Sequence, residues 1–140
     1  MSQEDTEWVR AGYEAFNRGD TAAWLDNFEP DAELHDLASV PGQRFYRGHD
    51  GLRKWADSMM ESFADFRFEP AEITEAGKFV VVTVRILARG LGSGVPTDMQ
   101  VFHVFELSAN GRAQSIAGFL SRAEALEALG LSEQDAHADS

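Results

Sequence analysis

We expect an α+β fold in a single domain covering residues 1–131, because three features of the sequence agree. Helical spacing of apolar residues dominates the first part of the chain, whereas strand-like alternation dominates the remainder. Helices followed by a run of strands are typical of α+β layer architectures. The 140 residues, 44% of them hydrophobic, suffice for one buried core but not for two domains. Residues 132–140 are expected to be a disordered tail.

Two helices are predicted at the start of the chain. The first carries an apolar stripe at helical spacing and ends at Arg18 and Gly19. Asp20 can then cap a second helix, because an aspartate side chain accepts hydrogen bonds from the free N–H groups of the first turn. Pro30 prevents this second helix from continuing. Together they form a helical hairpin.

A strand and a third helix are predicted next. Between residues 31 and 37 the apolar period changes to two, which predicts a strand. A connector runs from Ala38 to Gly48, and Asp50 is expected to cap the helix that follows. The broad apolar face of that helix comprises Leu52, Trp55, Ala56, Met59, Met60 and Phe63.

The rest of the chain predicts a four-stranded antiparallel meander and a short last helix. The strand-like runs cover residues 66–74, 79–89, 98–108 and 112–120. Ser121 followed by Glu124 is a capping-box pattern, and the helix that it opens should stop at Gly130. We expect the helices to cover one concave face of the sheet.

Composition excludes several classes of function. Twelve Lys and Arg against 24 Asp and Glu give a net charge of −12, which repels phosphate backbones and anionic lipid surfaces. We therefore expect no nucleic-acid partner and no membrane partner. The chain lacks an apolar run of the roughly 18 residues that a membrane span requires, as well as a basic signal region. A cytoplasmic location is predicted.

The sequence predicts neither a metal nor a cofactor. The absence of cysteine excludes thiolate nucleophiles and cysteine-ligated metals, and the four histidines do not share a face. The glycine-rich segment 90–94 precedes a strand instead of opening a helix, which argues against a phosphate loop. Acid–base chemistry and plain ligand binding are the classes that remain.

Two polar residues interrupt rows that are otherwise apolar. Asp36 has the same strand parity as Ala32 and Leu34, and His103 interrupts the inward row of the strand at 98–108. A buried carboxylate normally has a raised pKa, which suits a general base working near neutral pH, and a nearby imidazole could exchange a proton with it. Asp36 and His103 are therefore the candidate catalytic residues. Alternatively, Asp36 caps a turn and His103 is a core histidine bonded to a backbone carbonyl.

A set of large apolar residues could enclose an apolar ligand, although core packing is the simpler explanation for each of them. The candidate substrate pocket comprises Phe16, Trp24, Trp55, Met59, Val84, Met99, Val101, Phe105 and Ile116.

Several short segments carry a family resemblance. Residues 13–20 (YEAFNRGD), 30–36 (PDAELHD) and 46–52 (YRGHDGL), in this order, resemble the SnoaL-like branch of the nuclear-transport-factor-2-like superfamily. The resemblance implies a cone-shaped α+β barrel, in which three helices from the N-terminal half pack on a strongly curved, mixed, mainly antiparallel sheet. It also implies a deep apolar pocket. We separately expect a homodimer formed through the sheet.

The resemblance also implies site roles. Asp36 falls where ketosteroid isomerases of this superfamily carry their proton-abstracting aspartate. Gly12 falls where those enzymes have an oxyanion-hole tyrosine, with Tyr13 one position out of register, and His103 replaces their protonated aspartate. The inward row of the last strand lacks the acidic residue used by SnoaL-type polyketide cyclases.

The functional hypothesis is a cofactor-independent acid–base enzyme of the isomerase, cyclase, lyase or hydrolase type. Its substrate would be a mostly apolar carbonyl- or epoxide-like molecule, with Asp36 as general base and His103 as hydrogen-bond partner. The alternative is a non-catalytic domain that binds a small ligand or dimerises.

Overall fold

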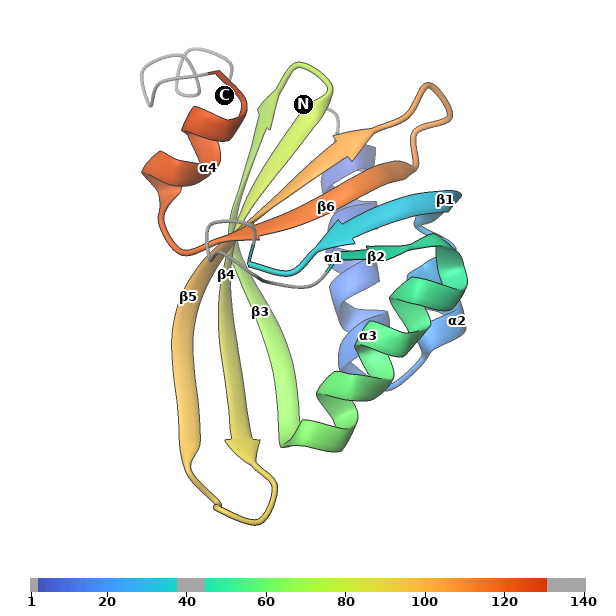
Figure 1. The fold of residues 1–140 in the computed structure, drawn as a ribbon. Helices are drawn as coiled ribbons and strands as arrows, with labels where there is room; N and C mark the ends of the chain where they lie inside the picture. Colours follow the sequence, from blue (N-terminus) through green and yellow to red (C-terminus); the bar gives the residue numbers. More distant parts are fainter. Residues whose placement is uncertain (1–2, 38–44, 131–140) are drawn as a thin grey trace.

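The computed structural model describes residues 3–37 and 45–130, which form four helices and one six-stranded mixed sheet (Figure 1). The α+β prediction is confirmed. The helices are α1 (Gln3–Asn17), α2 (Thr21–Leu25), α3 (Gly48–Ser62) and α4 (Arg122–Ala128). The strands are β1 (Phe28–His35), β2 (Phe45–Arg47), β3 (Phe63–Ala76), β4 (Phe79–Gly90), β5 (Pro96–Leu107) and β6 (Ala113–Phe119).

The sheet has the order β2-β1-β6-β5-β4-β3 and is not closed, since β2 and β3 are its two edges in the described residues. Strands β3 to β6 form the predicted antiparallel meander, and β1 pairs in parallel with β6. Opposed residues of neighbouring strands have side chains on the same face. The pairs Val82–His103 and His103–Gly118 therefore place these three residues in one row across the sheet.

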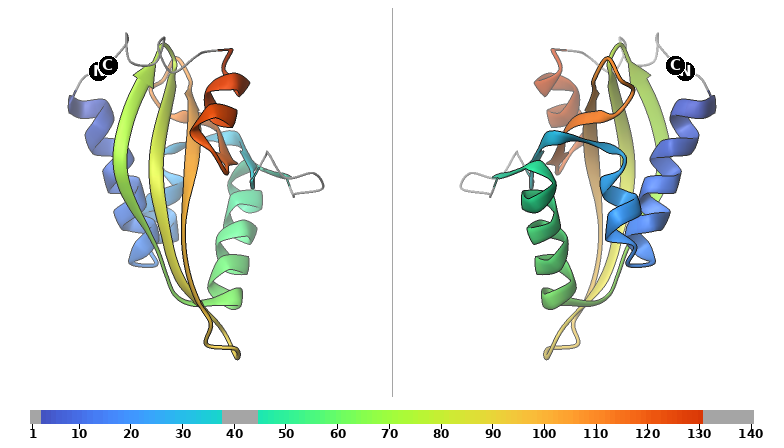
Figure 2. Two further views of the ribbon diagram at one scale, coloured as in Figure 1. Left: turned by 90° about the vertical axis from the view of Figure 1, so that its left-hand side faces the viewer. Right: turned by 90° about the vertical axis from the view of Figure 1, so that its right-hand side faces the viewer.

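Two apolar clusters lie on opposite faces of the sheet. The larger one joins α1, α2 and α3 to the inward side chains, among them Val82 and Phe105. The smaller one joins α4 to Val81, Val104 and Phe119, which have the other parity. Figures 1 and 2 show the long, bent strands and the position of α4 away from α2 and α3. The three helices of the N-terminal half thus cover the concave face, as expected.

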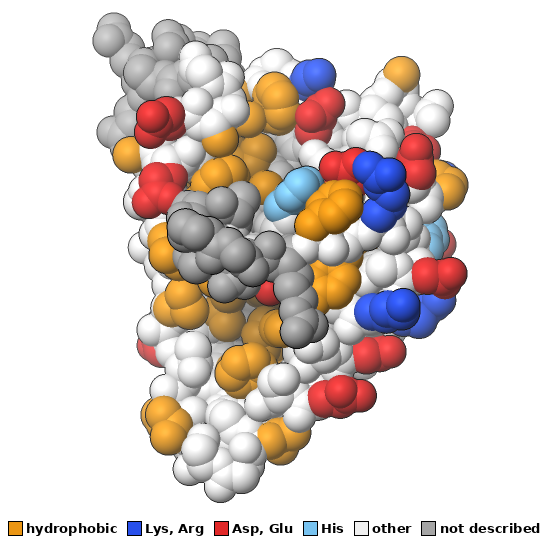
Figure 3. All heavy atoms as spheres, viewed as in Figure 1, with side chains coloured by type: hydrophobic (Ala, Val, Ile, Leu, Met, Phe, Trp, Pro, Cys, Tyr) orange, Lys and Arg blue, Asp and Glu red, His pale blue; other side chains and the backbone are white. Residues whose placement is uncertain are grey.

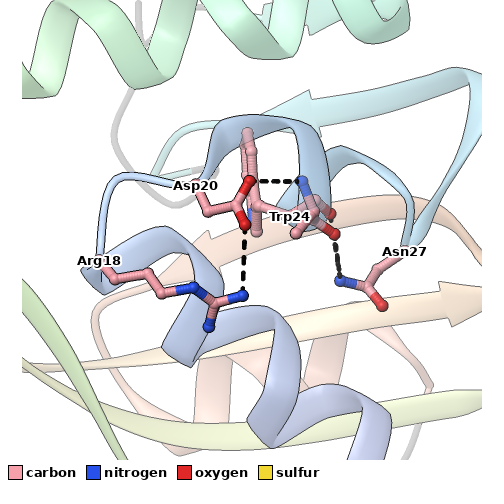
Figure 4. A network of polar contacts seen from close by, with 5 residues as sticks. Arg18, Asp20, Trp24 and Asn27 are labelled. Carbon is pink, nitrogen blue, oxygen red and sulfur yellow. Dashed lines mark hydrogen bonds and ion pairs between the residues drawn. The ribbon is translucent and has the colours of Figure 1, made fainter.

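Local hydrogen bonds explain the start of the two short helices. The Asp20 carboxylate accepts a hydrogen bond from the Ala23 backbone N–H at 3.1 Å, as predicted for a cap, and Arg18 pairs with the same carboxylate (Figure 4). The Ser121 hydroxyl accepts a hydrogen bond from the Glu124 N–H at the start of α4. Asn27 donates to the Trp24 carbonyl, which fixes the turn between α2 and β1 (Figure 4).

Several predicted boundaries are wrong, among them the end of the third helix, because Phe63 begins β3. The strand predicted at 31–37 is β1, which begins at Phe28 and ends at His35, so Asp36 lies in the turn beyond it. Helix α3 begins at Gly48, with Arg47 in place of Asp50 as the N-cap residue. Asp50 lies in the first turn, where its carboxylate interacts favourably with the helix dipole but does not cap the helix.

The predicted connector contains a strand that the sequence analysis missed. Strand β2 pairs with β1, and its three residues are too few for a clear alternation pattern. The rest of that connector and the tail at 132–140 lie outside the described residues. In the part of the chain that the structure describes, no helix is both long and apolar enough to span a membrane. The homodimer stays a prediction.

Candidate active site

A cavity of about 220 Å³ lies between the concave face of the sheet and the helices. Its wall is mostly apolar. It is lined by Tyr13, Trp24, Leu34, His35, Asp36, Leu37, Trp55, Met59, Phe63, Phe66, Phe68, Ile86, Ala88, Thr97, Met99, Val101, His103, Ile116 and Gly118. Among the described residues that line the cavity, Asp36 is the only one with a carboxylate. Figure 3 shows hydrophobic side chains gathered between the long strands and α3, and charged side chains of both signs over α3 itself.

Helix α1 positions Tyr13 against the sheet. One turn after Tyr13, the Asn17 side-chain amide donates to the Phe68 carbonyl and accepts from the Phe68 N–H, both at 2.8 Å. The amide therefore pairs with β3 in the manner of a neighbouring strand and locks the helix in place. Gly12 faces away, because a Cβ at Gly12 would lie 3.0 Å from the Asn27 side chain. Tyr13 consequently turns into the cavity.

Tyr13 and His103 form a buried hydrogen-bonded pair. The Tyr13 hydroxyl lies 2.7 Å from His103 Nδ1, and the two rings are nearly parallel with centroids 5.8 Å apart. Burial lowers the pKa of His103 from 6.5 to about 4 and raises the pKa of Tyr13 well above 10. Both groups are therefore neutral near pH 7. His103 bonds to a side chain, and the backbone-carbonyl alternative for this histidine is wrong among the described residues.

The direction of the Tyr13–His103 hydrogen bond depends on the tautomer of the histidine. The Tyr13 hydroxyl has one proton to donate, and His103 Nδ1 is its only hydrogen-bond partner in residues 3–37 and 45–130. If Tyr13 donates to Nδ1, a neutral imidazole carries its own proton on Nε2. His103 can then offer a neutral N–H donor to the cavity that it lines.

A close backbone approach positions Asp36. Leu37 adopts a φ of 45°, which is unfavourable for a residue with a side chain and turns the chain sharply after Asp36. The Leu37 nitrogen lies only 3.2 Å from where a Cβ on Gly118 would be. Glycine at 118 thus permits this turn, and it also leaves space beside its neighbour His103.

Replacing Gly118 with alanine is expected to displace Asp36. The added Cβ would push against the Leu37 backbone, and a misplacement of about 1 Å can cost about 100-fold in rate. We expect a loss of catalysis that exceeds the loss of stability, measured by comparing kcat with the free energy of unfolding. The matched control is Gly19→Ala, at a positive-φ glycine with no atom within 4 Å of the added Cβ. A Gly118→Ala variant with full kcat would contradict this role.

Asp36 is half-buried, and its environment favours the protonated form. Burial raises the pKa of Asp36, and a smaller effect of the nearby Trp55 indole lowers it. Even so, Trp55 Nε1 is buried and meets no acceptor with hydrogen-bond geometry among the described residues. Trp55 thus lies beside the carboxylate without making a regular hydrogen bond to it.

Most of the predicted site residues line the cavity. Asp36 and His103 both line it, together with Trp24, Trp55, Met59, Met99, Val101 and Ile116. Phe16, Val84 and Phe105 do not line it and are core residues, each at most 5% exposed. Phe16 packs against Trp24 and Trp55, whereas Phe105 packs against Trp8 and Tyr13.

Tyr13 is a site residue that was not among the predicted ones. The family resemblance placed it one position from the oxyanion-hole tyrosine, so Gly12 seemed to leave that place empty. Asn17, one turn later, gave a signal for the orientation of this helix. A polar residue on the apolar side of a helix needs a hydrogen-bond partner, so this side should face the sheet. No group of three or more His, Asp or Glu residues in the described ranges could hold a metal ion.

Comparison with known proteins identifies the family. Residues 9–116 match the model of the SnoaL-like domain. The chain belongs to this family. Sequence comparison of the SnoaL-like chain with curated proteins gives no match.

Solved structures similar to the SnoaL-like chain share its fold. A nuclear-transport-factor-2-like protein of unknown function from Burkholderia pseudomallei is 25% identical, with a TM-score of 0.75 over 91% of this chain and 97% of that chain. TerC, co-crystallised with polyporic acid, is 20% identical, with a TM-score of 0.72 over 88% and 95% of the two chains. SalBIII, described as epoxide hydrolase/cyclase-like, is 20% identical, with a TM-score of 0.72 over 86% and 92%.

Proposed function

We propose that the protein is an acid–base enzyme that acts on a compact, mostly apolar carbonyl- or epoxide-like molecule. The observation that carries this proposal is that Asp36, with its raised pKa, and the neutral donor His103 line one apolar cavity. Cavities for drug-sized ligands measure roughly 300–1,000 Å³, so the smaller volume here favours a ligand of one or two rings. No cofactor is required for this chemistry.

In the carbonyl reaction, the substrate oxygen would accept a hydrogen bond from His103 Nε2–H. Asp36 would remove a proton from the adjacent carbon, and the electron pair of the broken C–H bond would move into the carbonyl. His103 would stabilise the negative charge on the oxygen as a neutral donor, and Tyr13 would support it through the hydrogen bond to Nδ1, because neither group is ionised near pH 7. With an epoxide, Asp36 would instead take the proton of a water whose oxygen attacks a ring carbon, and the C–O bond from that carbon to the ring oxygen would break. The released oxygen, held by the His103 N–H group, would then receive the proton from Asp36 to give the diol.

Similar proteins support a small organic ligand. TerC was co-crystallised with polyporic acid, and SalBIII is described with a role in pyran ring formation in the polyether salinomycin. At 20% identity, both proteins share the fold with this chain. They support a small organic molecule as the class of ligand, and the ligand itself is to be identified by experiment.

Isotope exchange tests the proposal directly. In D₂O, the enzyme should accelerate deuterium incorporation beside the carbonyl of compact aromatic ketones, as followed by NMR. With aromatic epoxides in ¹⁸O-labelled water, it should give labelled diols. The Asp36→Asn variant supplies the control for both reactions. Exchange and hydrolysis that both remain at the rate without enzyme across the panel would refute the acid–base function.

Tyr13→Phe is expected to slow the reaction about tenfold or more, since the loss of an oxyanion-site contact costs up to 100–1,000-fold. His103 Nδ1 would lose its partner, and the imidazole would no longer be held in the Nε2–H tautomer. The measurements are the rate of deuterium exchange into the substrate and the ¹⁵N chemical shifts of the His103 ring. Wild-type exchange with an unchanged ring spectrum would show that Tyr13 has no such role.

The alternative is a ligand-binding domain without catalysis, and the scarcity of ionisable groups in the cavity wall favours it. In that case ligands should raise the melting temperature equally in the wild type and in Asp36→Asn, with no isotope exchange in either. Unequal stabilisation together with exchange supports the enzyme.

A further inference from the structure

The cavity is elongated along strand β5. Thr97, Met99, Val101 and His103 all line it, and they share one face of this strand. Side chains on one face of a strand repeat about every 6.6 Å, so the distance from His103 to Thr97 is about 20 Å along the strand. A volume of about 220 Å³ that extends over such a length is narrow. The cavity therefore suits a molecule that is long and thin.

The groups that the proposed function uses lie together at the His103 end of the cavity. Gly118 is opposite His103 in the sheet, and the backbone of Leu37, the residue after Asp36, closely approaches Gly118. Tyr13 makes its hydrogen bond to His103 at the same end. The reacting group of a substrate therefore belongs at this end, and the rest of the molecule must extend away from it.

The far end of the cavity has an almost entirely apolar floor. In the sheet, Met99 is opposite Ile86 and Thr97 is opposite Ala88, and all four residues line the cavity. Thr97 is the one polar residue among these four, and none of them is charged. The floor at this end therefore favours an uncharged, apolar part of a ligand, because burying a charge without a partner is costly.

Helix α3 forms the facing wall and extends in the same direction. Met59 lines the cavity from the helix, and Phe63, four residues later, lines it at the start of β3. The Ser62 carbonyl accepts a hydrogen bond from the Leu91 N–H at 3.2 Å, which joins the end of α3 to the β4–β5 hairpin (Figure 1). This hairpin is at the Thr97 end of the cavity. Both walls thus lead from the reacting groups to the hairpin.

We propose that the substrate carries an unbranched apolar tail, which extends from the reacting group along β5 and lies between Met99 and Met59. This inference rests on the proposed function and narrows its substrate. Met99 lies about 13 Å along the strand from His103, a length that one aromatic ring and about four CH₂ groups would span. The substrate class is then a ketone or epoxide on a ring whose far side bears a short alkyl chain.

Calorimetry with acetophenone, 4-butylacetophenone and 2-butylacetophenone tests the proposal. Each CH₂ group that becomes buried should improve affinity about fourfold, so the 4-butyl compound should bind about 100-fold more tightly than acetophenone. The 2-butyl isomer has the same composition, but its chain leaves the ring beside the carbonyl, and its gain should be less than about tenfold. Equal affinities of the two isomers would show unspecific hydrophobic binding and overturn the proposal.

A variant with less space at the tail position makes the test specific. Met99→Trp should reduce the gain of the 4-butyl compound to less than about tenfold, because the larger ring occupies the place of the chain. The matched control is Gln100→Trp, which adds the same ring at the next, exposed position on the other face of β5. Its gain should equal that of the wild type. An undiminished gain in folded Met99→Trp would contradict the proposed position of the tail.

A second measurement uses the wild-type protein and does not depend on the folding of a variant. With ¹³C-methyl methionine, the Met59 and Met99 methyl resonances should shift with 4-butylacetophenone and much less with acetophenone. Met60 is 41% exposed and does not line the cavity, so its resonance should stay in place. Absent binding, or equal shifts with both ketones, would overturn the proposal. Failure of the proposed function is separate, because it is seen as absent isotope exchange in acetophenone itself.

Discussion

Asp36→Asn should lower kcat/KM by about 100- to 10,000-fold, the range expected when a general base is removed. The amide is nearly isosteric with the carboxylate and can still accept a hydrogen bond, but it cannot take up a proton. The Trp55 contact and the turn at Leu37 should persist, so substrate binding should change much less than turnover. Loss of binding and turnover in equal measure would instead indicate that the aspartate only shapes the cavity.

The same substitution should increase stability near pH 7. Burial raises the pKa of Asp36 in the folded protein, so the unfolded chain gives up this proton at lower pH than the folded chain does. Stability from this group is full below the unfolded pKa and is lost as the pH rises through the folded pKa. Asparagine does not ionise, so the variant does not lose this stability as the pH rises. The free energies of unfolding of both proteins in denaturant, at pH 4 and at pH 7, measure the difference.

The pH profile of the wild type should report the same group. Activity requires the ionised carboxylate, so kcat/KM should rise with pH through a pKa above 3.8 and then level off. His103 is not expected to add a step near 6.5, because its pKa is lowered to about 4. A profile governed by a group near 6.5 would argue against a buried, neutral imidazole.

The overall fold could be predicted because its signals are periodic. Strands β3 to β6 coincide with the strand-like runs of the sequence, and Asp20 and Ser121 mark helix starts with the expected bonds to Ala23 and Glu124. These local signals depend on nearby residues only. Strand β2 could not be found, because its three residues make a pattern only through their pairing with β1.

The site was harder to predict, because it depends on rotations and close approaches. A shift of one position turns a helical residue by about 100°, and this decides that Tyr13 rather than Gly12 faces His103. Asp36 was identified by strand parity because the predicted strand, 31–37, extends two residues beyond His35, the last residue of β1. What actually positions Asp36 is the turn at Leu37, with a positive φ that no periodic pattern predicts for a leucine.

Replacing His103 should make the free energy of unfolding much less sensitive to mild acid. Its pKa is about 4 in the folded protein and about 6.5 in the unfolded chain, so below pH 6.5 only the unfolded chain takes up the proton. Stability from this group is therefore full above pH 6.5 and is lost as the pH falls toward 4. Across that range the loss amounts to about 3 kcal/mol.

His103→Gln isolates this contribution. The glutamine amide oxygen can still accept the Tyr13 hydroxyl, but the side chain does not titrate. The variant should start less stable at pH 7, because glutamine replaces a well-packed ring, and should then lose about 2 kcal/mol less than the wild type between pH 7 and pH 5. The control is His35→Gln, whose 43%-exposed imidazole lies at the protein surface. Parallel pH curves for the wild type and His103→Gln would mean that His103 is accessible to protons in the folded protein, and it could not then act as the neutral donor on which the oxyanion contact depends.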